Sequence, residues 1–305
     1  VFTPAAVSSF FEICDREPDG SKIMDAIRVG ARGGGFVIAR GNTTRAETGG
    51  SIKADSVMIN GKLTPHARTT LKVVELMRRK HGFARVKINH KIEPPVGSGF
   101  GTSGAGAVGA VIALSDLFDL RLTLSQASAY AHRAEVESIT GLGTVISIIS
   151  GSGAIGLVTE PGSYSIGRVD ALLADHNDYS LVCAWFGPIE KSTVLLNEEL
   201  RSKVNEYGRQ TLEAVLDERT PEAMLRHSRR FAELTGIATP ELLKLADKAK
   251  KLGALGATQN MIGNAIHCLV PKKGRKKFLD SFREFVPKKN FFETDLCHRG
   301  PTFID

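Results

Sequence analysis

The sequence predicts a protein of the α+β class, with its helices and strands arranged in two halves. Helical and strand patterns both recur along the chain, strict alternation of one strand with one helix is absent, and a Pro161-Gly162 turn divides the pattern. At 305 residues the chain has room for one large domain or two smaller ones. We expect one domain over residues 1–160 and a second over 161–305.

The first half is expected to contain strands joined by turns, followed by helices. Apolar runs and alternation predict strands at 36–39, 56–59 and 85–89, with an Asn60-Gly61 hairpin turn after the second. Apolar spacing predicts helices at 67–80, 103–118 and 124–138, and Thr123 or Ser125 can cap the last one. An apolar stretch at 145–149 precedes a strand at 155–159.

The second half is expected to be richer in helix. The pattern predicts strands at 179–185, 265–270 and 291–296, helices at 197–216, 221–234 and 240–252, and a basic helix before the final strand.

Composition favours a soluble globular protein, since 42% of residues are hydrophobic and 24% are charged. The four cysteines are isolated, which argues against a disulfide framework or a zinc site and favours a reducing compartment. The most apolar stretch, 105–114, is too short to span a bilayer, and the chain starts with no signal-like segment. We therefore expect a cytoplasmic protein without a membrane partner.

The formal net charge of +7 suits an anionic ligand but is weak support for nucleic acid as a partner. Lysines and arginines are spread along the chain except for a run at 272–277, which is most simply a solvated loop before a helix. Aromatic residues make up 7% of the chain and do not alternate with this run, so no base-stacking surface is expected.

Residues 94–109 form a loop rich in glycine and hydroxyl residues that leads into an apolar helix. Glycine at this density destabilises regular structure, so a close approach of the backbone to a ligand is expected. The first amides of a helix lack internal partners and carry partial positive charge, and together they bind phosphate. The alternative is a Gly/Ala-rich helix packed against a neighbour. The loop lacks the lysine of a Walker A motif, and no acid pattern of a dinucleotide fold follows it.

The string PVGSGFGTSGA at 95–105 resembles the PxxxGLGSSAA motif of the GHMP kinases. The resemblance implies a kinase that uses ATP and Mg²⁺ and acts on a small alcohol. It also implies an N-terminal ribosomal-protein-S5-like α/β domain and a C-terminal ferredoxin-like α+β domain. We also expect a homodimer. The resemblance assigns ATP binding to Pro95, Gly97, Ser98, Gly99, Gly101, Thr102, Ser103 and Gly104, and Mg²⁺ contact to Ser103.

Two further positions follow from the resemblance. The family has a Mg²⁺-binding glutamate on a helix shortly before a glycine turn, and Glu137, rather than Glu135, is the preferred match. After that turn several members carry a catalytic aspartate, where this chain has Thr144. Threonine is no general base at neutral pH. Either another acid serves or the acceptor hydroxyl attacks without a dedicated base.

The segments at 3–13, 30–36 and 253–267 are similar to the pantoate kinase branch of this family. That branch phosphorylates the 4-hydroxyl of pantoate in the synthesis of coenzyme A. A small carboxylate substrate needs a cation, and Arg32, beside Gly33, is the candidate, although it can equally be a surface residue in a turn. Ser9 and Asn260 are candidates for contacts to the acceptor's hydroxyls, and Ser9 can equally cap a helix.

Two alternatives remain open at this point. The chain can be a GHMP kinase for another small alcohol, such as homoserine, shikimate or a mevalonate derivative. Alternatively it can be a non-catalytic metabolite sensor on the same fold, an alternative that rests on the missing aspartate at Thr144.

Overall fold

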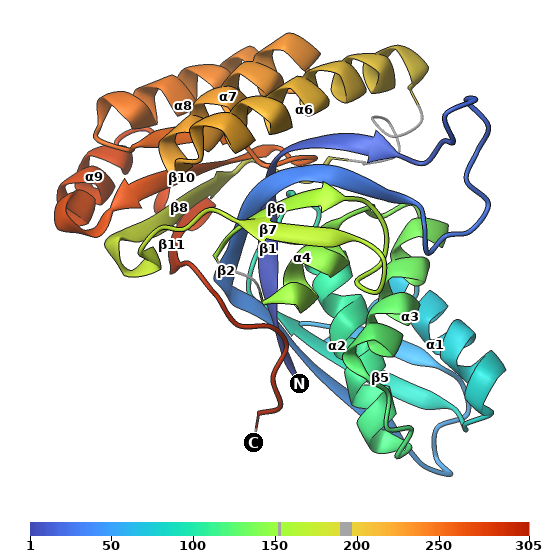
Figure 1. Cartoon of the computed structure of the whole chain (residues 1–305). Coiled ribbons are helices and arrows are strands. Elements are labelled where there is room, and N and C mark those ends of the chain that lie inside the picture. The colour runs from blue at the N-terminus through green and yellow to red at the C-terminus, as the bar shows by residue number, and fades with distance from the viewer. Residues whose placement is uncertain (152–153, 190–196, 305) are drawn as a thin grey trace.

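The computed structural model describes residues 1–151, 154–189 and 197–304, and its strands form two sheets (Figure 1). The first sheet contains β1 (Phe2–Cys14), β2 (Gly30–Thr48), β3 (Ser56–Ile59), β4 (Lys62–Leu63), β5 (Val86–Ile92), β6 (Ile155–Glu160) and β7 (Arg168–Ala171). The second contains β8 (Tyr179–Trp185), β9 (Gly256–Gln259), β10 (Ala265–Pro271) and β11 (Phe291–Asp295). Its strand order is β11-β8-β10-β9.

Helices pack against both sheets. Those of the first half are α1 (Arg68–His81), α2 (Thr102–Leu117), α3 (Leu124–Glu137) and α4 (Thr144–Ser150). Those of the second half are α6 (Glu198–Glu218), α7 (Pro221–Thr235), α8 (Pro240–Lys251) and α9 (Arg275–Phe282). Short 3₁₀ turns are η1 (His176–Asp178), η2 (Lys272–Gly274) and η3 (Lys288–Asn290). No helix in these described ranges is long and apolar enough to cross a membrane.

Strand β2 is the spine of the first sheet because it pairs along both edges. One edge pairs antiparallel with β1 over most of its length. The other edge pairs with β6 at residues 33–36 and with β5 at residues 42–48. Figure 1 shows β1 and β2 as long curved strands that pass α2 and also reach the helices of the second half.

Helix α2 is buried along most of its length, between α1 and α3 and against β2. Its glycines and alanines allow this close packing, while Val108, Val111 and Leu114 fill the core around it. Burial on every side explains why the sequence of α2 shows no polar face.

One hydrophobic core cluster contains residues of both halves. Phe10 and Phe11 of β1 pack edge-on against Phe231 of α7, with ring centroids 6.5 and 6.0 Å apart. Strand β7 follows the turn at 161–162 and still pairs with β6. The first sheet therefore extends past residue 160, and the change of sheet falls between β7 and β8.

The α+β class is confirmed by this arrangement, and most predicted elements are present. The strands predicted at 56–59 and 179–185 are β3 and β8, with the same bounds. The helix predicted at 124–138 is α3, and Thr123 caps it in a capping box with Gln126. The sequence pattern did not predict the 13-residue strand β1 or the short strands β4, β7 and β9.

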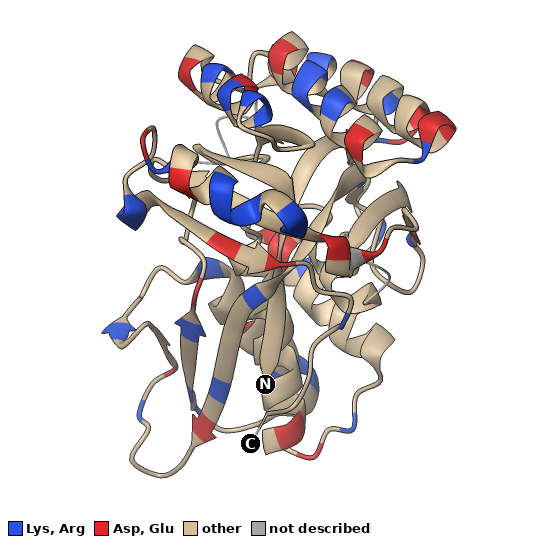
Figure 2. Ribbon diagram, turned by 90° about the vertical axis from the view of Figure 1, so that its left-hand side faces the viewer, with Lys and Arg blue, Asp and Glu red and all other residues tan. Residues whose placement is uncertain are grey.

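The basic run at 272–277 lies in η2 and α9, beside strand β11. Lys272 pairs with Asp295 at 3.1 Å, and Arg275 pairs with Glu293 at 2.6 Å. Figure 2 shows basic and acidic segments interspersed on this side of the molecule. Two of the five basic residues in the run are thus paired with acidic residues of β11.

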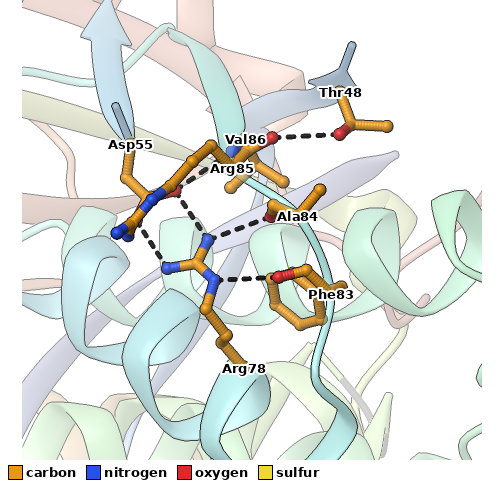
Figure 3. Close-up of polar contacts among 7 residues, drawn as sticks. All are labelled: Thr48, Asp55, Arg78, Phe83, Ala84, Arg85 and Val86. Carbon is orange, nitrogen blue, oxygen red and sulfur yellow. Dashed lines mark hydrogen bonds and ion pairs between the residues drawn. The ribbon is translucent and has the colours of Figure 1, made fainter. Parts of the chain in front are cut away.

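A polar cluster around Asp55 holds the end of α1 against the start of β5 (Figure 3). Arg78 of α1 binds both carboxylate oxygens of Asp55, at 2.5 and 2.6 Å, and donates to the carbonyl oxygens of Phe83 and Ala84. Arg85 and the amide of Val86 also donate to Asp55. Burial acts to raise the pKa of Asp55, but these hydrogen bonds outweigh it and leave the pKa below its ordinary value of 3.8.

We predict that Asp55→Asn lowers the free energy of unfolding by about 2 kcal/mol at pH 7, because it breaks charge-assisted hydrogen bonds that are partly buried. A carboxylate whose pKa is lowered by folding stabilises the protein above its unfolded pKa. This contribution is lost as the pH falls through the lower folded pKa, so the variant and wild type should converge in acid, below the ordinary value of 3.8. Urea unfolding at a series of pH values measures this difference.

Asp119→Asn is the matched control, because Asp119 and its partner Arg121 are 74% and 81% exposed. Equal losses in the two variants at pH 7 would contradict the role given to the Asp55 cluster.

Candidate active site

The loop at 94–101 leads into α2, which begins at Thr102. Hydrogen bonds to distant segments fix its shape. Ile189 N donates to Gly97 O at 3.1 Å, and Ser98 Oγ donates to Gly187 O at 3.2 Å. The loop is therefore held from the side of the second sheet, and its other side opens to a pocket at the start of α2.

The loop also lies against the turn at 260–263, closer than side chains allow. A Cβ at Gly263 would overlap the carbonyl group of Ser98, and one at Gly99 would lie 2.8 Å from Asn260 Cβ. Gly99 also has φ of +80°, which disfavours any other residue. Two glycines from distant parts of the chain thus let two backbones touch.

Two pockets adjoin this loop. The first, which we call the nucleotide pocket, is lined among others by Arg68, Thr69, Gly99, Gly101, Thr102 and Ser103. The second, which we call the acceptor pocket, is lined among others by Ser8, Arg32, Gly33, Thr144, Ser147 and Met261. A Cβ at Gly101 would lie 2.6 Å from Thr144 Cγ2 and 2.9 Å from Ala6 O, and both of these residues line the acceptor pocket. The two pockets therefore lie on either side of this contact, near the N-terminus of α2.

Glu135, rather than Glu137, is the acid beside Ser103. Glu135 is fully buried on α3, and its Oε1 lies 3.5 Å from Ser103 Oγ. Glu137 lies on the outside of α3, where it pairs with Arg133 at 2.6 Å and with Lys72 at 3.7 Å. The structure therefore does not bring together Ser103 and Glu137, the two metal ligands inferred from the sequence.

The hydroxyl of Ser103 and the carboxylate of Glu135 fit a magnesium ion. Mg²⁺ prefers oxygen ligands, and in kinases it takes one or two carboxylates together with substrate phosphates. No group of three or more His, Cys, Asp or Glu residues suited to a metal occurs in the described part of the chain. The donor set at Ser103 therefore suits an ion that arrives with a nucleotide better than a resident metal centre.

Arg32 lies in the wall of the acceptor pocket beside Gly33. It is the only charged residue among the described residues that line this pocket. Glu12 binds one edge of its guanidinium group, with Oε2 lying 2.9 Å from Nε and 2.6 Å from Nη2. The side chain of Arg32 is 33% exposed, so the remaining donors can reach a ligand.

The side chains of Ser9 and Asn260, predicted to bind the acceptor, do not reach the acceptor pocket. Both are fully buried, and each forms a hydrogen bond with His267. Ser8 lines the pocket instead, and Ser9 lies where the pairing of β1 with β2 is irregular, between Ser8 and Phe10. The run of small residues before Ser8 does not alternate, so the sequence did not reveal which serine faces the pocket.

The remaining predicted residues of the loop divide into two groups. Those that line the nucleotide pocket are Gly97, Gly99, Gly101, Thr102 and Ser103. Those that do not are Pro95, Ser98 and Gly104. Ser98 is 1% exposed, and its hydroxyl donates to Gly187 O rather than facing the nucleotide pocket.

Comparisons with known proteins identify related kinases. Residues 68–152 match the family of the GHMP kinases N terminal domain. A protein named pantoate kinase from Thermococcus kodakarensis is 31% identical over 281 residues, which cover 90% of this chain and 89% of that protein. A pantoate kinase from Methanocaldococcus jannaschii is 28% identical over 275 residues, which cover 90% of this chain and 93% of that protein.

Solved structures with the same fold are also found. A phosphotransferase related to the CoA biosynthesis pathway superposes with a TM-score of 0.84 at 27% identity, covering 99% of this chain and 96% of that chain. A mevalonate kinase from Methanococcus jannaschii superposes with a TM-score of 0.71 at 16% identity, covering 97% of each chain. At 16% identity, the likeness to the mevalonate kinase supports the fold alone.

We predict that Gly263→Ala weakens binding of ATP at least about tenfold, because the added Cβ must push the loop away from the turn and disturb the phosphate site. Calorimetric titration with ATP measures the change. Gly274→Ala is the control, since no atom lies within 4 Å of a Cβ at that position. Equal affinities of the two variants for ATP would show that the close contact does not shape the site.

Proposed function

This chain belongs to the pantoate kinase family of the GHMP kinases, and we propose that it transfers the γ-phosphoryl group of ATP to the 4-hydroxyl of pantoate. The observation that carries the proposal is that the nucleotide and acceptor pockets lie on either side of one contact near the N-terminus of α2. A phosphoryl group bound in one pocket would there face a hydroxyl group held in the other.

The start of α2 is suited to the phosphates of ATP. The amides of Thr102, Ser103 and Gly104 lie in the first turn, where helix amides have no partner within the helix. Their partial positive charge favours an anion, and the loop itself contains no lysine. Arg68 is the only lysine or arginine among the described residues that line the nucleotide pocket, which makes it the candidate for additional charge neutralisation.

Ser103 and Glu135 are the residues that would hold Mg²⁺ with the nucleotide. When bound, the ion would neutralise charge on the phosphate oxygens during transfer. Glu135 is suited to this role by position, since it is buried beside Ser103 and the first turn of α2. Glu137, preferred in the sequence-based assignment, is turned toward Arg133 and Lys72 and is left out of the proposed site.

Arg32 is the proposed partner of the pantoate carboxylate. Glu12 holds one edge of the guanidinium group and leaves the other edge for an acceptor carboxylate, the geometry in which arginine binds carboxylates well. Ser8 and Thr144 line the same pocket and offer hydroxyl groups to the polar end of the acceptor.

The transfer itself requires position and charge neutralisation more than a base. The acceptor oxygen forms a bond to the γ-phosphorus while the bond to the β–γ bridging oxygen breaks and ADP leaves, and the proton of the acceptor hydroxyl passes to a phosphoryl oxygen and then to water. No carboxylate is found among the described residues that line the acceptor pocket. A loose transition state needs little activation of the attacking hydroxyl, so Thr144 at the place of an aspartate is compatible with turnover. The homodimer and the cytoplasmic location stay predictions.

We predict that ATP and Mg²⁺ with pantoate give 4-phosphopantoate and ADP. The value of kcat/KM should exceed that for homoserine, shikimate or mevalonate by about a hundredfold or more. All four acceptors carry a carboxylate that Arg32 can bind, so the preference depends on how the rest of each molecule fits the hydroxyl and apolar residues of the pocket. Coupled detection of ADP measures the rates. Faster turnover of another alcohol would contradict the acceptor assignment, and no turnover with any acceptor would favour a metabolite sensor.

We predict that Glu135→Gln lowers kcat about a hundredfold by removing the charged metal ligand, whereas Glu137→Gln changes it less than about threefold. The same ADP assay at saturating Mg²⁺ measures both. A large loss in Glu137→Gln with normal turnover in Glu135→Gln would restore the assignment made from the sequence.

A further inference from the structure

A chain of buried hydrogen bonds joins strand β1 to the phosphate loop, through strand β10 and the turn at 260–263. Ser9 Oγ lies 2.8 Å from His267 Nε2, and His267 Nδ1 lies 2.9 Å from Asn260 Oδ1. Asn260 Nδ2 then lies 3.5 Å from Ser98 O. Ser9, Asn260 and His267 have no exposed surface, and Ser98 is 1% exposed.

The direction of each hydrogen bond follows from the chemistry of the groups. Burial lowers the pKa of His267 to about 3, so the ring is neutral and carries one N–H. The side-chain oxygen Oδ1 of Asn260 can only accept a hydrogen bond, so the proton of the His267 ring lies on Nδ1. Nε2 of His267 therefore accepts from the hydroxyl of Ser9. The amide of Asn260 in turn donates to the carbonyl of Ser98. All three bonds can therefore exist together.

Each end of this chain lies one residue away from a pocket. Ser8, next to Ser9, lines the acceptor pocket, and its carbonyl accepts from the amide of Met261 at 2.9 Å. Gly99, next to Ser98, lines the nucleotide pocket. The hydrogen bonds thus connect the wall of one pocket with the loop of the other, and His267 lies at their centre.

We infer that His267 is a positioning residue that holds the phosphate loop at a fixed distance from the acceptor pocket, acting through Ser9 and Asn260. This inference rests on the proposed kinase function. His267 contacts neither substrate, so its effect is on the alignment of the phosphoryl group with the acceptor hydroxyl. A shift of about 1 Å between reacting groups can lower a rate about a hundredfold.

The test compares His267→Leu, which keeps bulk but breaks both hydrogen bonds, with His267→Gln, which keeps a donor and an acceptor. Cys268→Ala is the control for loss of core packing, because Cys268 is the adjacent, fully buried residue of β10 and packs in the core under α8 and α9. The measurements are kcat, the KM values for ATP and pantoate, and thermal unfolding.

We expect His267→Leu to lower kcat at least about tenfold relative to Cys268→Ala, with both KM values within about threefold of wild type. His267→Gln should recover part of the rate. The inference is overturned if kcat of His267→Leu lies within about twofold of that of Cys268→Ala, or if KM carries the whole loss.

Ser9→Ala gives a second test if His267→Leu fails to fold. It removes only the hydroxyl that donates to Nε2, and we expect kcat to fall several-fold while the unfolding temperature stays near that of wild type. An unchanged kcat would overturn the inference. Lack of turnover in the wild-type chain would overturn the proposed function and this inference together, whereas normal wild-type turnover with unaffected variants would overturn the inference alone.

Discussion

The contact between the phosphate loop and the turn at 260–263 is the constraint on which the rest of the site depends. The two segments are about 160 residues apart in the chain, a separation seen in the Asn260–Ser98 hydrogen bond. Their backbones touch because Gly99 and Gly263 have no side chains to keep them apart. The loop therefore stands against the second half of the molecule, while the helix it leads into belongs to the core of the first half.

The same contact brings the two pockets together. Strand β1 carries Ser8 on the wall of the acceptor pocket and Ser9 on its buried side. Strand β2 places Arg32 in that pocket, and the start of α2 lies beside Thr144. Because β1 and β2 pair along most of their length and pack against helices of both halves, a shift of one half would change the acceptor site and the phosphate site at once.

Much of the fold could be predicted from the sequence, because its signals are local. Apolar periodicity, the Asn60-Gly61 turn and the Thr123 cap fall within a few residues of the elements they define. Strand β1 was harder to predict, because it is buried along nearly its whole length and its small residues show no alternation. A turn signal such as the one at 161–162 does not show whether the next strand returns to the same sheet, as β7 does.

The position of the glycine-rich loop in the candidate site could be predicted from the sequence. Which of two nearby side chains faces the site could not. The glycine pattern located the loop and α2. It could not distinguish Glu135 from Glu137, or Ser8 from Ser9, because these choices depend on which face of a helix or strand meets the rest of the fold. The sequence did not indicate a role for His267 for a similar reason. Its partners Ser9 and Asn260 are 258 and 7 residues away, and only the folded chain brings them together.

The proposed reaction depends most on how ATP and pantoate lie relative to each other. A crystal structure with Mg²⁺, pantoate and a non-hydrolysable ATP analogue tests this directly. We predict phosphates on the amides of Thr102, Ser103 and Gly104, the metal between Ser103 and Glu135, and the 4-hydroxyl of pantoate facing the γ-phosphate beside Thr144. Phosphates bound away from the start of α2, or pantoate bound outside the acceptor pocket, would contradict it.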